Sequence, residues 1–194
     1  MGRAETDVLT VEQFLQLPEI KPPLEFVRGR VVQKVSPVAP HCKLGQTLWL
    51  WIYRHTLVHQ LGECFLELRC TFHGESLVPD VVYFDPGRIP SDDRGEYIAE
   101  GMHQAPDLIV EIISPGQTVK ALSSRLARCI AKGVRLAWMV QPRKRRAFVF
   151  RPGRPPETLQ VGDELNGEDV LPGFRLALAE MFGWLAVGSK PFPA

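Results

Sequence analysis

Two proline–aspartate dipeptides, each at the start of an apolar stretch, bring acidic side chains into segments that have the composition of buried strands. Pro79 and Asp80 precede residues 81–84, and residues 107–113 begin with an aspartate and contain Glu111. A carboxylate inside such an apolar run is costly unless it is paired or binds a metal ion. If the two segments pair as antiparallel strands, the start of the first lies beside the end of the second, and Asp80 is expected next to Glu111. Two carboxylates there would repel each other unless a divalent cation lay between them, so the pattern predicts a metal site.

The same residues have a second interpretation that needs no metal. Each aspartate caps a turn after its proline, and Glu111 pairs with Arg125 or another basic side chain. Asp107 is a weaker ligand candidate, because it lies about 13 Å from Glu111 along an extended strand and is too far away to share an ion directly. Spacing alone leaves the metal site and the ion-paired site open.

Other chemistry-bearing residues give weaker signals. His55 and His59 are one helical turn apart, but no glutamate follows His55, so the zinc-protease pattern fails. The basic run at residues 143–146 is expected at a hairpin turn, either solvated or in contact with DNA phosphates. The four cysteines form no Cys-x-x-Cys pair, which argues against a zinc ribbon or a redox motif and favours a reduced, cytosolic setting.

The elements that must position the acidic residues follow from apolar periodicity and from glycine and proline punctuation. Helices are predicted for residues 11–15, for a segment through Leu44 and Ile52 that ends before Gly62, and for residues 118–132 and 178–184. Strands are predicted for a hairpin, 24–28 with 30–35, and for residues 63–72, 80–84, 107–113, 136–140, 146–150 and 157–160. Polar residues between 84 and 107 are expected to form a loop, and a turn is expected around Gly162 and Gly167. This order predicts a single α/β or α+β domain over residues 1–194, with helices flanking a mixed central sheet.

Composition excludes several classes of protein. The chain has 194 residues, of which 45% are hydrophobic and 23% charged, so it can bury a substantial core and is not intrinsically disordered. A net charge of +1 excludes a generally basic nucleic-acid coat, although not a local basic cleft. No apolar run is long enough to cross a membrane, and the charged start lacks a secretory signal. Gly2 and Thr6 fit the short myristoylation pattern.

Several ordered motifs together resemble one prokaryotic family. They are LEFVRGRVV at residues 24–32, PDV at 79–81, APDLIVEIISP at 105–115, GVR at 133–135, GDEL at 162–165 and DVLPGF at 169–174. The sequence resembles the Uma-two family of restriction-endonuclease-like proteins, a branch of the PD-(D/E)XK nuclease superfamily. The resemblance covers roughly residues 8–183.

The resemblance implies a restriction-endonuclease-like core with additional β-hairpins. In it, Asp80 and Glu111 match the acidic metal ligands, with help from the Ile112 carbonyl, and Glu25 matches an acidic residue that often joins them. The superfamily usually has a lysine two residues after the second acid. In this family that lysine is expected on the following helix, where Arg125 stands.

The remaining site candidates carry less weight. Lys120 is the alternative to Arg125 if the helix position is misassigned, and His41 is expected near the site. Asp107 stays the weakest of the acidic candidates.

The implied activity is that of a Mg²⁺-dependent endonuclease, with Mn²⁺ as a substitute, that hydrolyses DNA phosphodiester bonds as a cytoplasmic homodimer. The metal ion would activate water, and Arg125 would stabilise the transition state. Because arginine remains charged where lysine can lose a proton, two alternatives stay open. One is a catalytically impaired nucleic-acid-binding protein. The other is a structural or protein-interaction protein whose acids are held by Arg125.

Overall fold

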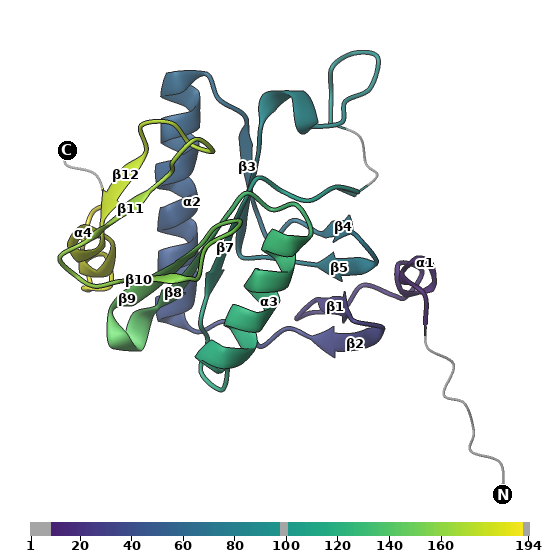
Figure 1. The fold of residues 1–194 in the computed structure, drawn as a ribbon, viewed down its shortest axis with the longest axis horizontal. Helices are drawn as coiled ribbons and strands as arrows, with labels where there is room; N and C mark the ends of the chain where they lie inside the picture. Colours follow the sequence, from purple (N-terminus) through teal and green to yellow (C-terminus); the bar gives the residue numbers. More distant parts are fainter. Residues whose placement is uncertain (1–8, 98–100, 192–194) are drawn as a thin grey trace, which may run out of the picture.

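The computed structural model describes residues 9–97 and 101–191, which form a central sheet with helices on both faces (Figure 1). The elements in chain order are α1 (Val11–Phe14), β1 (Leu24–Val27), β2 (Arg30–Gln33), α2 (Ala39–His59), β3 (Glu63–Leu66), β4 (Cys70–Phe72), β5 (Glu75–Leu77), β6 (Val81–Phe84), η1 (Pro86–Arg88), β7 (Leu108–Ile112), α3 (Val119–Ala131), β8 (Leu136–Gln141), η2 (Pro142–Lys144), β9 (Arg146–Phe150), β10 (Glu157–Leu159), β11 (Glu164–Asn166), β12 (Arg175–Ala177) and α4 (Leu178–Gly183). The myristoylation pattern at Gly2 and Thr6 lies outside the described residues.

The central sheet is mixed. Its six strands have the order β10-β9-β8-β7-β6-β3. β7 and β8 are parallel, whereas the other neighbouring pairs are antiparallel. Parallel neighbours need a crossover connection, and α3 supplies it between β7 and β8. The predicted mixed sheet flanked by helices is therefore confirmed.

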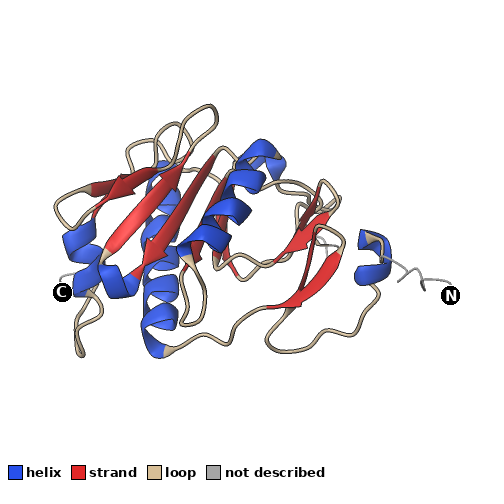
Figure 2. Ribbon diagram, turned by 60° about the horizontal axis from the view of Figure 1, so that its bottom comes forward, coloured by secondary structure: helices blue, strands red, loops and turns tan. Residues whose placement is uncertain are grey.

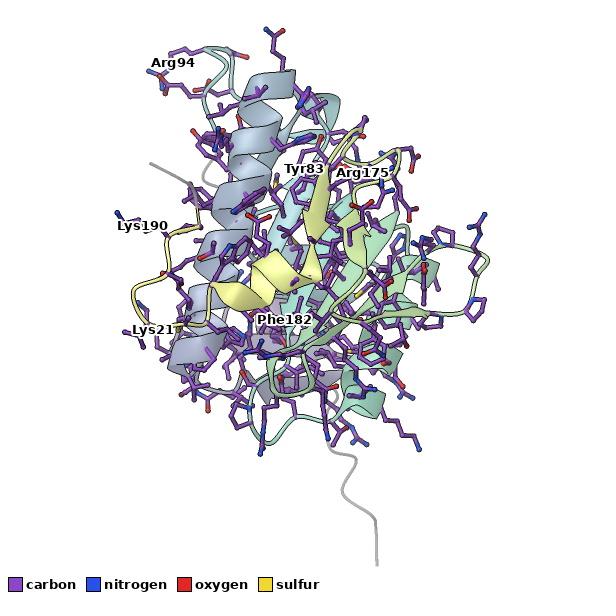
Figure 3. The ribbon with its side chains drawn as sticks, turned by 90° about the vertical axis from the view of Figure 1, so that its left-hand side faces the viewer. Lys21, Tyr83, Arg94, Arg175, Phe182 and Lys190 are labelled. Atoms are coloured by element: carbon purple, nitrogen blue, oxygen red, sulfur yellow. The ribbon has the colours of Figure 1, made fainter. Side chains whose placement is uncertain are left out.

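Side chains alternate between the two faces of this sheet and build two separate cores. On one face α2 packs through Leu44, Leu48 and Ile52. α4, on which Phe182 is labelled in Figure 3, packs beside α2 on the same side of the sheet. On the other face α3 packs through Leu122, Leu126 and Cys129. Alternate residues of β7, namely Leu108, Val110 and Ile112, belong to the core on the α2 side, so Ile109 and Glu111 lie on the face that α3 covers.

A second, smaller sheet lies beside the α3 face of the central sheet (Figure 2). Its order is β2-β1-β5-β4, and the predicted hairpin of β1 and β2 forms one half of it. The turn at Arg28 and Gly29 has positive φ at both residues, the conformation that tight two-residue hairpins require. This sheet places Glu25 of β1 and the end of β2 close to the edge where β6 begins.

The prediction of one strand over residues 63–72 is wrong. The chain breaks at Glu67, which has a φ of 48°, and forms β3 and β4 in two different sheets. β3 pairs with β6, whereas β4 pairs with β5, a strand that was not predicted. Apolar residues alternate across the break, although Leu66 beside it is exposed. The alternation therefore carries no information about the pairing partner.

Turns are present around Gly162 and Gly167 as predicted, because the Asp163 N–H donates to the Gln160 carbonyl and the Val170 N–H donates to the Gly167 carbonyl. The strands β11 and β12, which pair as a short hairpin, were not predicted. Each strand has only three residues, too few for a clear alternating pattern. The terminal helix follows as expected. No helix of residues 9–97 and 101–191 is long and apolar enough to cross a membrane.

Gly62 allows α2 to connect to β3 against the end of β6. A Cβ on Gly62 would lie 1.8 Å from the carbonyl oxygen of Phe84, so the backbone of one segment would have to move. We expect Gly62→Ala to lower the free energy of unfolding by about 1–3 kcal/mol. Chemical denaturation measures this loss. The matched control is Gly162→Ala, where no atom lies within 4 Å of the added carbon, and equal stability losses in the two variants would contradict the explanation.

Candidate active site

The antiparallel pairing of β6 and β7 brings Asp80 beside Glu111. Val81 pairs with Val110 in the register, so the residue before β6 lies next to the end of β7. The Asp80 carboxylate accepts a hydrogen bond at Oδ2 from the Ile112 main-chain N–H at 2.7 Å. The predicted proximity of Asp80 and Glu111 is confirmed, and its cause is the register.

Two basic side chains lie on the Asp80 carboxylate. Lys34, which follows β2, donates from Nζ to Oδ1 at 2.8 Å, and His41 Nε2 lies 3.0 Å from Oδ2. His41 is in the first turn of α2, where a proline at the helix start fixes the entry of the chain. Burial works to raise the pKa of Asp80, but the hydrogen bond from His41 and the charge of Lys34 lower it to about 2. Asp80 is therefore a carboxylate at neutral pH.

Arg125 connects the two other acids of the cluster. Its guanidinium donates from Nη1 to Glu25 Oε2 at 2.6 Å and from Nη2 to Glu25 Oε1 at 2.7 Å. Glu25 Oε1 also accepts the Val78 N–H at 2.8 Å, which fixes the carboxylate. Although desolvation works to lower the pKa of Arg125, the charges of Glu111 and Glu25 raise it, so the guanidinium stays charged.

The Glu111 carboxylate is less well hydrogen-bonded than those of Asp80 and Glu25. Its Oε1 forms an ion pair with Arg125 Nη2 at 2.8 Å. However, this buried oxygen accepts no hydrogen bond from a described residue. Burial, together with the charge of Asp80, raises the pKa of Glu111 to about 7 against the attraction of Arg125. At Glu111, burial thus outweighs the attraction of Arg125 and Lys34.

These oxygens fit a hard divalent cation. The Asp80 and Glu111 carboxylates and the main-chain carbonyl of Ile112 are donors of the kind that Mg²⁺ and Mn²⁺ prefer. The oxygen of Glu111 without a hydrogen bond is the observation that favours a cation here. Among the described residues, no group of three or more His, Cys, Asp or Glu side chains is arranged as a metal cage. Mg²⁺ usually keeps several waters and uses only one or two carboxylates.

Lys34 is the residue of this cluster that the sequence analysis missed. Burial works to lower its pKa, but the charges of Glu111 and Asp80 raise it, so it is a cation. Its position at the end of an exposed hairpin strand resembles that of many solvated lysines. Lys34 could have been predicted from its hairpin, which also carries Glu25, an acid already assigned to the site.

Asp107 is at the other end of β7 and is separate from the cluster. Its carboxylate accepts the Asp85 N–H at 2.9 Å and pairs with Arg88 and Arg135. The fully buried side chain therefore joins the loop after β6 to the start of β8. Lys120 is exposed at the start of α3.

The His55 and His59 side chains have structural contacts of their own. His55 Nε2 lies 3.0 Å from the Pro172 carbonyl oxygen, and the rings of His55 and His59 are 4.3 Å apart.

A cleft of about 790 Å³ opens beside the cluster on the side of the small sheet. Lys34 and Val78 form part of its wall, together with residues 19–23, 35–37, Glu67 and Arg69. Arg69 is held there by an ion pair with Glu19 at 3.0 Å. The side chain of Lys34 is 12% exposed and that of Asp80 is 4% exposed, so Lys34 lies between the cleft and the buried acid.

Comparison with known proteins identifies relatives of this chain. The family model Uma2, described as "putative restriction endonuclease", matches residues 11–179. A crystal structure of "a putative nuclease belonging to DUF820" from Anabaena variabilis is similar at a TM-score of 0.87 and 31% identity, covering 92% of this chain and 99% of that chain. No curated protein matches the chain. The restriction-endonuclease-like fold expected from the sequence is confirmed by this structural match.

Proposed function

Because the chain belongs to the Uma2 family, we propose that it is a Mg²⁺-dependent endonuclease that hydrolyses phosphodiester bonds of DNA. The observation that supports this most is the pair of buried carboxylates, Asp80 and Glu111, brought together by the register of β6 and β7. Both face a cluster of basic side chains, which suits a negatively charged substrate.

Asp80, Glu111 and the Ile112 carbonyl are the groups that would hold the cation. When bound, the cation would polarise the phosphoryl oxygen and lower the pKa of an attacking water. Asp80 is suited to this role because it is charged at neutral pH. At Glu111 the cation would meet a buried carboxylate oxygen that accepts no hydrogen bond from a described residue.

The proposal also assigns a role to Arg125, because its guanidinium is held in place. Its bidentate pairing with Glu25 holds the guanidinium in one orientation, so its positive charge is positioned before substrate binds. We propose that this charge stabilises the negative charge that develops on the phosphoryl group, and that Glu25 positions Arg125.

A second candidate function follows from the same contacts. Both oxygens of Asp80 already have partners, and Glu25 is paired with Arg125, so the acids can be held without a metal. The protein would then be a catalytically impaired nucleic-acid-binding or protein-interaction protein with the nuclease fold.

Calorimetric titration with Mg²⁺ and Mn²⁺ tests the proposed function. We expect the wild-type protein to bind the metals, Asp80→Asn to lose binding, and the exposed-loop variant Asp93→Asn to bind as the wild type does. No binding by the wild type, or equal binding by Asp80→Asn, would remove Asp80 and the metal from the proposal.

A homodimer in the cytoplasm is a further part of this proposal. Two sites related by twofold symmetry would allow a dimer to cleave both strands of a duplex. Light scattering after gel filtration would give a mass near twice the monomer mass of 21.8 kDa for a dimer.

A further inference from the structure

Lys34 lies at the point where the cleft meets the buried acids. Its ammonium donates to Asp80 Oδ1 at 2.8 Å and to the Val78 carbonyl at 2.7 Å. The other oxygen of Asp80 is already used, because Oδ2 accepts the Ile112 N–H and lies next to His41. Oδ1 is therefore the oxygen of Asp80 that is most open to a cation, and Lys34 occupies it.

We propose that Lys34 is an internal counter-cation of Asp80, which leaves this carboxylate when a divalent cation binds and then presents its ammonium to the cleft. Lys34 has this role only if Asp80 and Glu111 form the proposed metal site. An ammonium and a divalent cation on the same carboxylate oxygen repel each other, so the two compete for Asp80. The competition weakens metal binding in the resting protein.

The surroundings of Lys34 allow this movement. Its second acceptor is a main-chain carbonyl of Val78, which is in the wall of the cleft, so the ammonium keeps a partner after it leaves Asp80. The flexible four-carbon side chain can turn about this contact. A substrate phosphate in the cleft would then meet a positive charge next to the metal.

Arg125 cannot take the same role. Its guanidinium is held by two hydrogen bonds to Glu25, which itself is fixed by the Val78 N–H. Arg125 therefore provides a stationary charge, whereas Lys34 provides a charge that moves.

Metal affinity tests the competition without any need for cleavage. We expect Lys34→Met and Lys34→Gln to bind Mn²⁺ about tenfold more tightly than the wild type in calorimetric titration, since the competing charge is gone. Lys34→Gln keeps a hydrogen-bonding side chain, so it tests the competition even if Lys34→Met does not fold. The matched control is Lys21→Met, which removes a lysine from the wall of the same cleft and should bind within twofold of the wild type. Both Lys34 variants should cleave DNA more slowly in spite of tighter metal binding.

A second measurement uses the wild-type protein. Acetylation of Lys34 by an amine-reactive reagent, followed by mass spectrometry, should increase several-fold when Mg²⁺ is added and should not increase in Asp80→Asn. Unchanged or weaker Mn²⁺ binding in the folded Lys34 variants, or unchanged acetylation with metal, would overturn the role of Lys34 while leaving the proposed nuclease intact. Absence of metal binding in the wild type would instead refute the proposed function, and the role of Lys34 with it.

Discussion

Arg125→Ala is expected to lower the free energy of unfolding by about 3–5 kcal/mol, because it leaves two buried acids without their shared cation. Glu25 and Glu111 both lie within ion-pair distance of this guanidinium, and their side chains are 3% and 5% exposed. Their mutual repulsion would add to the cost of burying each charge. Urea denaturation at neutral pH with a chelator present measures the loss.

Arg128→Ala is the matched control on the same helix. The Arg128 side chain is 30% exposed, and its Nε lies 3.6 Å from Glu75 Oε1, so we expect a loss of about 1 kcal/mol or less. Arg125→Lys should recover part of the stability, since it keeps the charge but loses the paired hydrogen bonds. Equal losses in Arg125→Ala and Arg128→Ala would show that Arg125 does not neutralise the acidic cluster.

Glu111→Gln is expected to stabilise the metal-free protein by about 2–3 kcal/mol above pH 7. The pKa of Glu111 is raised from 4.5 to about 7 by burial, so the folded protein binds this proton more tightly than the unfolded chain does. The stability that Glu111 contributes is therefore full at low pH and falls as the pH rises from about 4.5 through about 7. Glutamine does not titrate, so the difference between variant and wild type should grow across this window and then stay constant.

Thermal unfolding at several pH values, with and without Mg²⁺, checks this expectation. The wild type should gain melting temperature with Mg²⁺ through binding to the folded state, and Glu111→Gln should not. Glu180→Gln, on the exposed side of α4, should behave as the wild type does at every pH. A full Mg²⁺ shift in Glu111→Gln would remove Glu111 from the proposed ligands.

Local patterns in the sequence were enough to predict the central part of the site. An acid stands at the start of one apolar run and near the end of the other, so antiparallel pairing was expected to bring Asp80 beside Glu111, and the observed register does so. The ion-paired interpretation also named Arg125 as a partner of Glu111, and Arg125 Nη2 lies 2.8 Å from Glu111 Oε1. Each of these inferences depends on one strand pair or one helix.

Contacts between distant segments could not be predicted in the same way. Lys34 reaches Asp80 because the small sheet lies against the α3 face, and no periodicity in residues 30–35 records that position. The break between β3 and β4 is equally hidden, since both strands keep apolar residues on buried faces while pairing in different sheets. The pairing of strands depends on the whole chain, so the sequence of one segment does not reveal its partner strand.

Cleavage of supercoiled plasmid DNA tests the nuclease most directly. The wild-type protein and Glu111→Ala are incubated with plasmid in Mg²⁺, in Mn²⁺ and in a chelator, and the nicked and linear products are measured over time. We expect the wild type to cleave only with metal, and Glu111→Ala to cleave at least about 10³-fold more slowly, which corresponds to ~4 kcal/mol of activation free energy. No metal-dependent cleavage by the folded wild-type protein, or equal rates for the two proteins, would contradict the assignment of Asp80 and Glu111 as a nuclease site.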